Sequence, residues 1–188
     1  VNDISEITSL SMPIIISTPV SSLESIGGIL KNNNILKIPI LLTCKGIDSK
    51  SGLFPTEVMS KYIDINNLAV MSGPSFAAEV LKNKPTAVTL AAQNKKVLKI
   101  FSKLFHHKYF RVYEAEDMLG CQIGGAMKNI LSVAVGISDG LELGSNAKAA
   151  IITRGMLEIK QVGEALKCNE KTISGLSGIG DLVLTAND

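Results

Sequence analysis

The chain has 188 residues, of which 46% are hydrophobic and 19% charged, and its formal net charge is +2. This composition is typical of a soluble globular protein and excludes an intrinsically disordered one. Lysines and carboxylates are interspersed, so the dense basic stripe that nucleic-acid binding needs is absent. No apolar run approaches the roughly 18 residues of a membrane span. Three separated cysteines without a CxxC pair favour neither a metal site nor a disulfide framework, and they indicate a reduced, cytoplasmic compartment.

The first part of the chain alternates short apolar runs with amphipathic stretches. The apolar runs predict strands at 13–17, 38–44, 68–71, 86–92 and 109–113. The stretches between them predict helices at 21–31, 53–62, 75–82 and 95–106. Because the strands are apolar throughout, the sheet should be covered on both faces, as in parallel βαβ units. We therefore predict part of a doubly wound α/β domain over residues 1–115.

The pattern changes after Glu114. Residues 117–137 are rich in Gly, Ala and Val at helical spacing, and residues 146–166 predict a second long helix with Asn146 as its N-cap. The glycines of residues 171–188 indicate a bend into a short helical corner. Residues 116–188 are therefore predicted to be all-helical.

Candidate ligand-binding residues follow the predicted strands directly. An α/β sheet binds ligands at the carboxyl ends of its strands, where Pro19, Lys45 and the segment 72–75 (SGPS) lie. Lys45 should face a crevice, although its position also fits a solvated lysine that opens a loop. In the segment 72–75 a glycine precedes a predicted helix, whose free N–H groups favour an anion. An ordinary strand-to-helix turn is the alternative.

Gly124 and Gly125 lie inside an apolar helical pattern just before Lys128. Each glycine costs about 1 kcal/mol relative to alanine in a helix, so another part of the backbone should pass close by. Lys128 stands beside Ile130 and Leu131, which we expect to be buried, and a lysine among apolar residues is a candidate proton donor or acceptor. The alternative is a helix-packing glycine pair beside a lysine whose amine reaches solvent.

A third glycine-rich stretch, residues 175–181, is not a dinucleotide-binding loop. It follows helices rather than a strand, and its glycine spacing does not match GxGxxG. We expect a tight corner that brings Asp181 and Thr185 to a defined place.

Seven segments, in this order, resemble the bacterial NAD(P)-dependent glycerol-3-phosphate dehydrogenases. The resemblance implies a partial Rossmann-like, NAD(P)-binding domain over residues 1–115 and a helical catalytic domain over residues 116–188. It also implies reversible hydride transfer between NAD(P)H and dihydroxyacetone phosphate, which gives sn-glycerol 3-phosphate for phospholipid synthesis. The segments are 43–47 (TCKGI), 71–80 (MSGPSFAAEV), 85–88 (PTAV), 110–113 (FRVY), 124–129 (GGAMKN), 151–155 (IITRG) and 175–185 (GLSGIGDLVLT).

The resemblance also implies roles for individual residues. Lys128 is the implied general acid and base, and Lys45 is expected to contact both cofactor and substrate. A homodimer is compatible with the resemblance, whereas a membrane span or a nucleic-acid partner is not implied. The substrate site is expected to include Gly73, Ser75, Asn129, Asp181 and Thr185, and the NAD or NADP site Ala77 and Pro19.

Two segments of that family have no counterpart here. One is the N-terminal half-domain with its GxGxxG-type loop, and the other is a C-terminal Ser-Arg-Asn segment whose arginine binds phosphate. We therefore expect a fragment that is inactive or weak alone and that leaves one sheet edge unpaired. The residues that choose between NAD and NADP belong to the first of these segments.

Two other interpretations remain at this stage. A related hydroxyacid or sugar-acid dehydrogenase also pairs a nucleotide-binding domain with a helical one, but the adjacent Lys128-Asn129 and the SGPSFA segment argue against it. A non-catalytic remnant that acts as an interaction module is the alternative from a different functional class.

Overall fold

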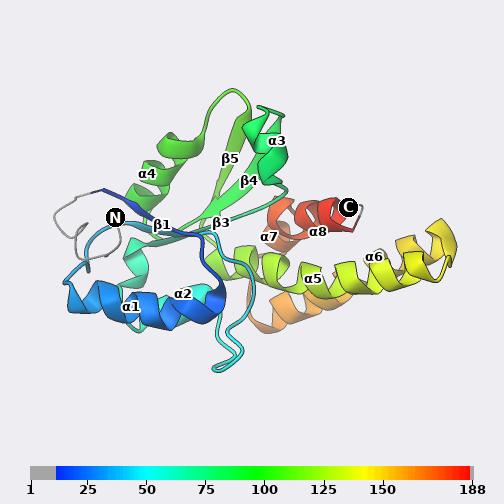
Figure 1. The fold of residues 1–188 in the computed structure, drawn as a ribbon, viewed down its shortest axis with the longest axis horizontal. Coiled ribbons are helices and arrows are strands. Elements are labelled where there is room, and N and C mark those ends of the chain that lie inside the picture. The colour runs from blue at the N-terminus through cyan, green and yellow to red at the C-terminus, as the bar shows by residue number, and fades with distance from the viewer. Residues whose placement is uncertain (1–11, 187–188) are drawn as a thin grey trace.

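The computed structural model describes residues 12–186, which form a five-stranded sheet flanked by helices and a long helical hairpin that projects from it (Figure 1). The strands lie side by side in chain order, so that each connection joins neighbouring strands. They are β1 (Ile14–Ile16), β2 (Ile40–Leu42), β3 (Leu68–Ser72), β4 (Thr86–Ala91) and β5 (Phe110–Ala115).

Helices cover both faces of the sheet, as predicted from the continuous apolar strands. In β2, Ile40 and Leu42 pack against α1 (Leu23–Asn32) and α2 (Pro55–Ser60), whereas Leu41 belongs to the core cluster under α4 (Lys95–Phe105). Successive residues of a strand point to opposite faces, and all three side chains are fully buried. Two apolar layers therefore hold the sheet between them.

The sheet is mixed, so the prediction of parallel units throughout is wrong. The pairs β1–β2, β2–β3 and β4–β5 are parallel, but β3 pairs with β4 antiparallel, with Ser72 opposite Thr89. The connection contains only α3 (Ala77–Leu81), a helix of five residues. A helix of that length spans about 7.5 Å and cannot carry the chain back along a strand of about 16 Å. The chain therefore reverses at the carboxyl end of β3.

The second part of the described chain is helical, as predicted. The antiparallel helices α5 (Met118–Gly140) and α6 (Gly144–Ala165) form the projecting hairpin (Figure 1). The predicted corner consists of α7 (Glu170–Ile173), the π-helical turn η4 (Leu176–Gly180) and α8 (Asp181–Thr185), while its last residues, 187 and 188, lie outside the described residues. Asp117 caps α5 by accepting the N–H of Gly120. Asn146 is not a cap, because α6 begins two residues earlier, after a tight turn with positive φ at Glu142 and Gly144.

Helix α5 is the core helix of this part, yet one of its faces is open. Within residues 12–186 it is the one helix long and apolar enough to cross a membrane by length and composition, and half of its apolar window is buried inside the fold. Its outer face carries Ile130, Val133 and Ile137, whose exposed fractions are 67%, 64% and 59%. The prediction that Ile130 is buried is therefore wrong, because α6 covers the other side of α5, where Leu131 packs against Gly155.

One edge of the sheet is open among the described residues. β1 has β2 as its one strand neighbour there, and Ile15 is 45% exposed. This arrangement agrees with the unpaired edge expected from the sequence.

The buried Cys121 thiol makes the stability of the fold sensitive to alkaline pH. Burial raises the pKa of Cys121 from 9.0 to about 12. Above pH 9 the unfolded thiol ionises while the folded one keeps its proton, so stability falls as the pH rises. We expect the free energy of unfolding to fall by about 1.4 kcal/mol per pH unit more in the wild type than in Cys121→Ala.

Urea denaturation at a series of pH values from about 8 to about 10.5 measures this difference in slope. Val135→Ala is the matched control, because it also truncates a buried side chain of α5 but removes no titrating group. Its pH dependence should run parallel to that of the wild type. Equal slopes for Cys121→Ala and the wild type would contradict the prediction.

Candidate active site

The two adjacent glycines of α5 allow two other segments to approach the helix closely. A Cβ atom on Gly124 would lie 2.2 Å from the carbonyl oxygen of Ser177 in η4. A Cβ atom on Gly125 would lie 3.1 Å from Ser72 Oγ and 3.4 Å from Lys45 Cγ. The expectation that backbone passes close to this glycine pair is therefore confirmed at Gly124. At Gly125 the helix meets the ends of β2 and β3 instead.

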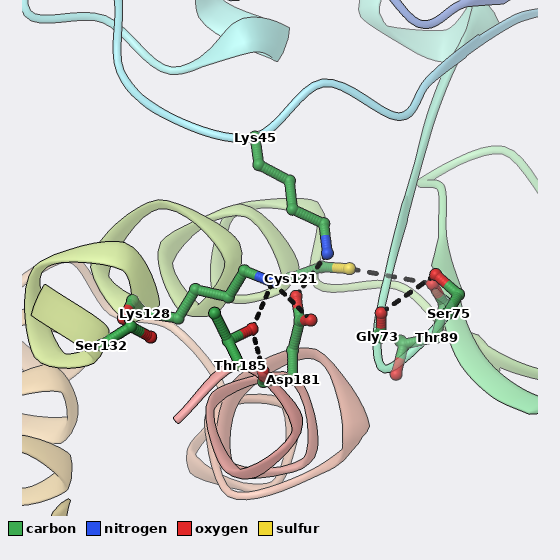
Figure 2. Close-up of polar contacts among 9 residues, drawn as sticks. All are labelled: Lys45, Gly73, Ser75, Thr89, Cys121, Lys128, Ser132, Asp181 and Thr185. Carbon is green, nitrogen blue, oxygen red and sulfur yellow. Dashed lines mark hydrogen bonds and ion pairs between the residues drawn. The ribbon is translucent and has the colours of Figure 1, made fainter. Parts of the chain in front are cut away.

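This close approach brings three charged side chains together (Figure 2). Asp181 Oδ1 accepts a hydrogen bond from Lys128 Nζ at 2.6 Å, and Asp181 Oδ2 accepts one from Lys45 Nζ at 2.5 Å. Lys128 Nζ also donates to Thr185 Oγ1 at 3.0 Å, and that hydroxyl donates to the carbonyl of Asp181. One carboxylate thus joins two lysines from distant parts of the chain.

Each member of this cluster comes from a different element. Lys45 lies just after β2 and is followed by Gly46, whose φ of 125° turns the chain away from the sheet. Lys128 lies in the middle of α5, and Asp181 is the first residue of α8. The prediction that the glycine-rich corner delivers Asp181 and Thr185 to a defined place agrees with this geometry.

The cluster is largely shielded from water and carries a net positive charge. The side chains of Asp181, Lys128 and Lys45 are 2%, 10% and 27% exposed. Burial lowers the pKa of Lys45, although the Asp181 carboxylate opposes this shift, and the neighbouring charge of Lys128 adds to the lowering. Two ammonium groups share one carboxylate, so the site favours an anionic or electron-rich ligand.

The segment after β3 lies beside the cluster. Gly73 is buried with a φ of 148°, and a Cβ atom there would lie 2.9 Å from Val88 Cα, so only glycine fits without strain. Pro74 lies within 3.6 Å of the place where Gly180 would carry a Cβ, which puts this segment next to the start of α8. Ser75 is exposed and donates a hydrogen bond to the carbonyl of Gly73.

The helix that follows this segment differs from the predicted one. α3 begins at Ala77 rather than Ser75 and is only five residues long. Pro74 and Ser75 therefore precede the helix instead of forming its first turn. So short a helix has a weak dipole, and the anion site expected at its N-terminus loses most of its support.

Three residues with predicted binding roles lie apart from the cluster. Asn129 is exposed on α5, because a helix turns by about 100° per residue and Lys128 occupies the inward position. Pro19 is exposed between β1 and the 3₁₀ turn η2 (Val20–Ser22), and Ala77 is exposed at the start of α3. Their roles stay predictions.

One buried polar residue at this site, Gln122, was missed by the sequence analysis, whereas Ser72 belongs to the segment 72–75 singled out there. Ser72 is 5% exposed, and its hydroxyl has no hydrogen-bond partner among the described residues. Gln122 is 4% exposed and makes several hydrogen bonds. A glutamine inside the apolar helical pattern of α5 was the signal available for Gln122, and the end of a predicted strand was the signal that pointed to Ser72.

An open cavity of about 680 Å³ lies elsewhere, between β4, β5 and α7. Its lining includes Glu114, Glu116 and Asp117 together with Lys171, so both charges are present. The two lysines and the carboxylate described above are not part of it.

Similar proteins come from several bacteria. The chain is 40% identical over 173 residues to a glycerol-3-phosphate dehydrogenase [NAD(P)+] from Neisseria meningitidis, with 92% of this chain and 53% of that protein covered. It is 42% identical over 173 residues to the protein of the same name from an Acidovorax species, with 92% of this chain and 52% of that protein covered. The chain thus spans about half the length of the curated relatives it matches.

Solved structures give the same result. A crystal structure of glycerol-3-phosphate dehydrogenase from Coxiella burnetii superimposes with a TM-score of 0.91 at 38% identity, covering 99% of this chain and 57% of that one. The Plasmodium falciparum glycerol-3-phosphate dehydrogenase also reaches 0.91, at 25% identity, covering 99% and 53%. A D-mandelate dehydrogenase, which is a hydroxyacid dehydrogenase, reaches only 0.54 at 13% identity and shares the fold alone.

Family profiles match both parts of the chain. The profile described as the NAD-dependent glycerol-3-phosphate dehydrogenase N-terminus matches residues 1–98. The profile described as the C-terminus of the same dehydrogenase matches residues 117–188. The first match ends within α4, and the second begins just after β5, where the sheet gives way to helices. The chain therefore belongs to the NAD-dependent glycerol-3-phosphate dehydrogenase family.

Proposed function

We propose that this protein interconverts dihydroxyacetone phosphate and sn-glycerol 3-phosphate by hydride transfer with NAD(P)H. The observation that carries the proposal is the pair of lysines, Lys45 and Lys128, held on the buried carboxylate of Asp181. Lys45 follows the carboxyl end of β2, and the helix that carries Lys128 meets the ends of β2 and β3 at Gly125, on the side where α/β sheets bind their ligands. Family membership and the activity for which the relatives are named support the same reaction.

The chemistry of the reduction fits these side chains. Hydride addition to a ketone leaves negative charge on the carbonyl oxygen, and a cation aimed at that oxygen stabilises the transition state. Lys128 Nζ donates the proton to this oxygen, and it takes the proton back in the reverse direction. Asp181 and Thr185 fix the direction of the amine by accepting its other N–H groups.

Lys45 has a different part in this proposal. Its amine shares Asp181 with Lys128 but is more exposed, so it can contact both the substrate and the cofactor. A second cation at this place attracts the anionic substrate and adds to the stabilisation of the developing oxyanion. Gly73 and Ser75 line the substrate side next to α8, and the substrate contact expected of Asn129 stays part of the proposal although this residue faces outward from α5.

The residues present fit the nicotinamide end of NAD or NADP. The buried Ser72 hydroxyl has no hydrogen-bond partner among the described residues and lies beside the Lys45 side chain, so it would be one donor for a polar group of a cofactor that reaches it. When bound, the reduced nicotinamide supplies the hydride. Lys45 would contact this end of the cofactor, and the cofactor contacts proposed for Ala77 and Pro19 lie apart from the lysine cluster.

The wider assignments rest on the same proposal. The cofactor domain covers residues 1–115 and the helical catalytic domain residues 116–188. The protein acts in the cytoplasm on a small phosphorylated substrate and provides the glycerol phosphate for phospholipid synthesis. A homodimer is the oligomeric state we propose to test alongside the activity.

The activity can be tested directly on the 188-residue chain. After its intact mass has been confirmed, the oxidation of NADH and NADPH that depends on dihydroxyacetone phosphate is measured. We expect Lys128→Met to lower kcat by about 10²–10⁴-fold, because it removes the proton donor. Lys103→Met on the exposed face of α4 is the control and should keep wild-type turnover.

Two results would overturn this proposal. Absence of turnover at the correct mass would show that the chain is not an enzyme by itself. Turnover that survives Lys128→Met within a few-fold would remove Lys128 from the mechanism.

The stability of the fold should depend on Asp181. Asp181→Asn keeps the shape of the side chain but leaves two ammonium groups close together without a carboxylate. Removing one partner of a buried ion pair costs about 3–5 kcal/mol, and we expect a loss of this size in urea denaturation. The pKa of Lys45 should fall further, since Asp181 opposes the lowering.

Glu170→Gln is the matched control for this measurement. This substitution breaks the ion pair between Glu170 and Lys160, in which the Glu170 side chain is 76% exposed. Exposed pairs contribute about 0–1 kcal/mol, so this variant should stay close to the wild type. A similar loss of unfolding free energy in both variants would show that the Asp181 ion pairs stabilise the fold no more than an exposed ion pair does.

A further inference from the structure

Gln122 joins the segment that carries Lys45 to the helix that carries Lys128. The Gln122 side-chain oxygen accepts the backbone N–H of Thr56 at 2.9 Å. Its amide nitrogen donates to Thr56 Oγ1 at 2.8 Å and to the carbonyl of Met118 at 3.0 Å. Gln122 and Thr56 are 4% and 5% exposed, so water does not compete for these bonds. The Gln122 side-chain amide therefore uses both of its N–H groups and its oxygen in hydrogen bonds to Thr56 and to its own helix.

The segment from β2 to α2 is internally braced. The Asp48 carboxylate accepts hydrogen bonds from the backbone N–H and the hydroxyl of Ser51. The backbone N–H of Asp48 donates to the carbonyl of Leu53, which closes the loop on itself. Because this loop is held together by its own hydrogen bonds, the positions of its two ends determine where Lys45 lies. One end is fixed by β2, and the other end is the N-terminal turn of α2, where Thr56 meets Gln122.

The same end of the segment also packs on the helical part. Phe54 is 9% exposed and belongs to the apolar cluster that contains Ile123 and Met156. This contact supplies apolar burial but no direction, because apolar packing is not directional. The hydrogen bonds of Gln122 supply the direction, since their geometry fixes where Thr56 lies along α5.

Position along α5 matters because Lys128 lies on the same helix. Gln122 and Lys128 are separated by about 9 Å along the helix axis. Gln122 also lines, with Lys45, Ser72 and Gly125, a void too small to admit water. A shift of Thr56 along α5 would therefore move Lys45 relative to Asp181 and Lys128.

We propose that Gln122 is a positioning residue, which clamps Thr56 to α5 and so holds the Lys45 amine on Asp181 beside Lys128. Its effect on turnover rests on the function proposed above, but its effect on Lys45 does not. A glutamine with a merely structural role would change the stability of the fold and leave the environment of Lys45 as it is. The titration of the Lys45 amine distinguishes the two roles.

The experiment is competitive trace labelling of amines with acetic anhydride across a pH series, with each lysine quantified by mass spectrometry. Lys103, which is exposed on α4, is the internal reference. In the wild type, Lys45 should titrate below the ordinary lysine value of 10.5, because burial lowers its pKa. In Gln122→Met, which keeps the length of the side chain but removes the amide, Lys45 should titrate closer to 10.5. It should also label at least several-fold faster than in the wild type at high pH.

Two variants of the partner residue complete the test. Thr56→Val removes the hydroxyl but keeps the backbone N–H, so it should shift Lys45 in the same direction by less. Thr56→Ser keeps both the hydroxyl and the backbone N–H, so Lys45 should titrate in this variant as it does in the wild type. If Gln122→Met fails to fold by circular dichroism, Thr56→Val carries the test alone. Wild-type titration of Lys45 in a folded Gln122→Met, or in Thr56→Val where the first variant is unfolded, would overturn the proposal.

Turnover separates this inference from the proposed function. Where the wild-type chain is active, Gln122→Met should lose at least about tenfold in kcat, because misplacing a catalytic group by 1 Å costs as much or more. Where the wild type is inactive, the labelling experiment still decides the role of Gln122. If the wild type is active and the titration of Lys45 is unchanged in the variants, the proposed function is kept and the positioning role of Gln122 is rejected.

Discussion

The sharing of one carboxylate by two lysines is the interaction on which the site depends. Asp181 is almost fully buried, and a buried carboxylate must be paired to remain charged. Its two oxygens are taken by Lys45 and Lys128, which arrive from the sheet and from α5. These two ion pairs hold the sheet against the helices, and they leave a net positive charge at the cluster.

Close packing of backbone makes this contact reachable. Gly124 lets η4 touch α5, and this contact sets the start of α8 where Asp181 stands. Gly125 lets the Lys45 side chain pass α5 on its way to the carboxylate. A methyl group at Gly124 would meet backbone, which cannot move aside as a flexible side chain can. The cost of the glycines in the helix is offset by the contacts they allow.

The reversal of the chain after β3 shapes the sheet side of the site. The short α3 leaves β4 antiparallel to β3, and Gly73 sits against Val88 at the turn. The segment 73–75 is consequently folded back toward α8 instead of leading into a crossover helix. Local apolar pattern does not report such a reversal, because a buried strand reads the same in either direction.

The sequence by itself determined the fold class, the change from sheet to helices near residue 115, and the segments that hold the site residues. These follow from local pattern: apolar runs covered on both faces, helical periodicity, and glycines that cost free energy unless backbone comes near. Only the tertiary structure decided that Asp181 binds both lysines, that Asn129 and Ile130 face outward, and that Gln122 ties α2 to α5. Such contacts join residues far apart in the chain, and their existence depends on how the elements pack, which no local pattern specifies.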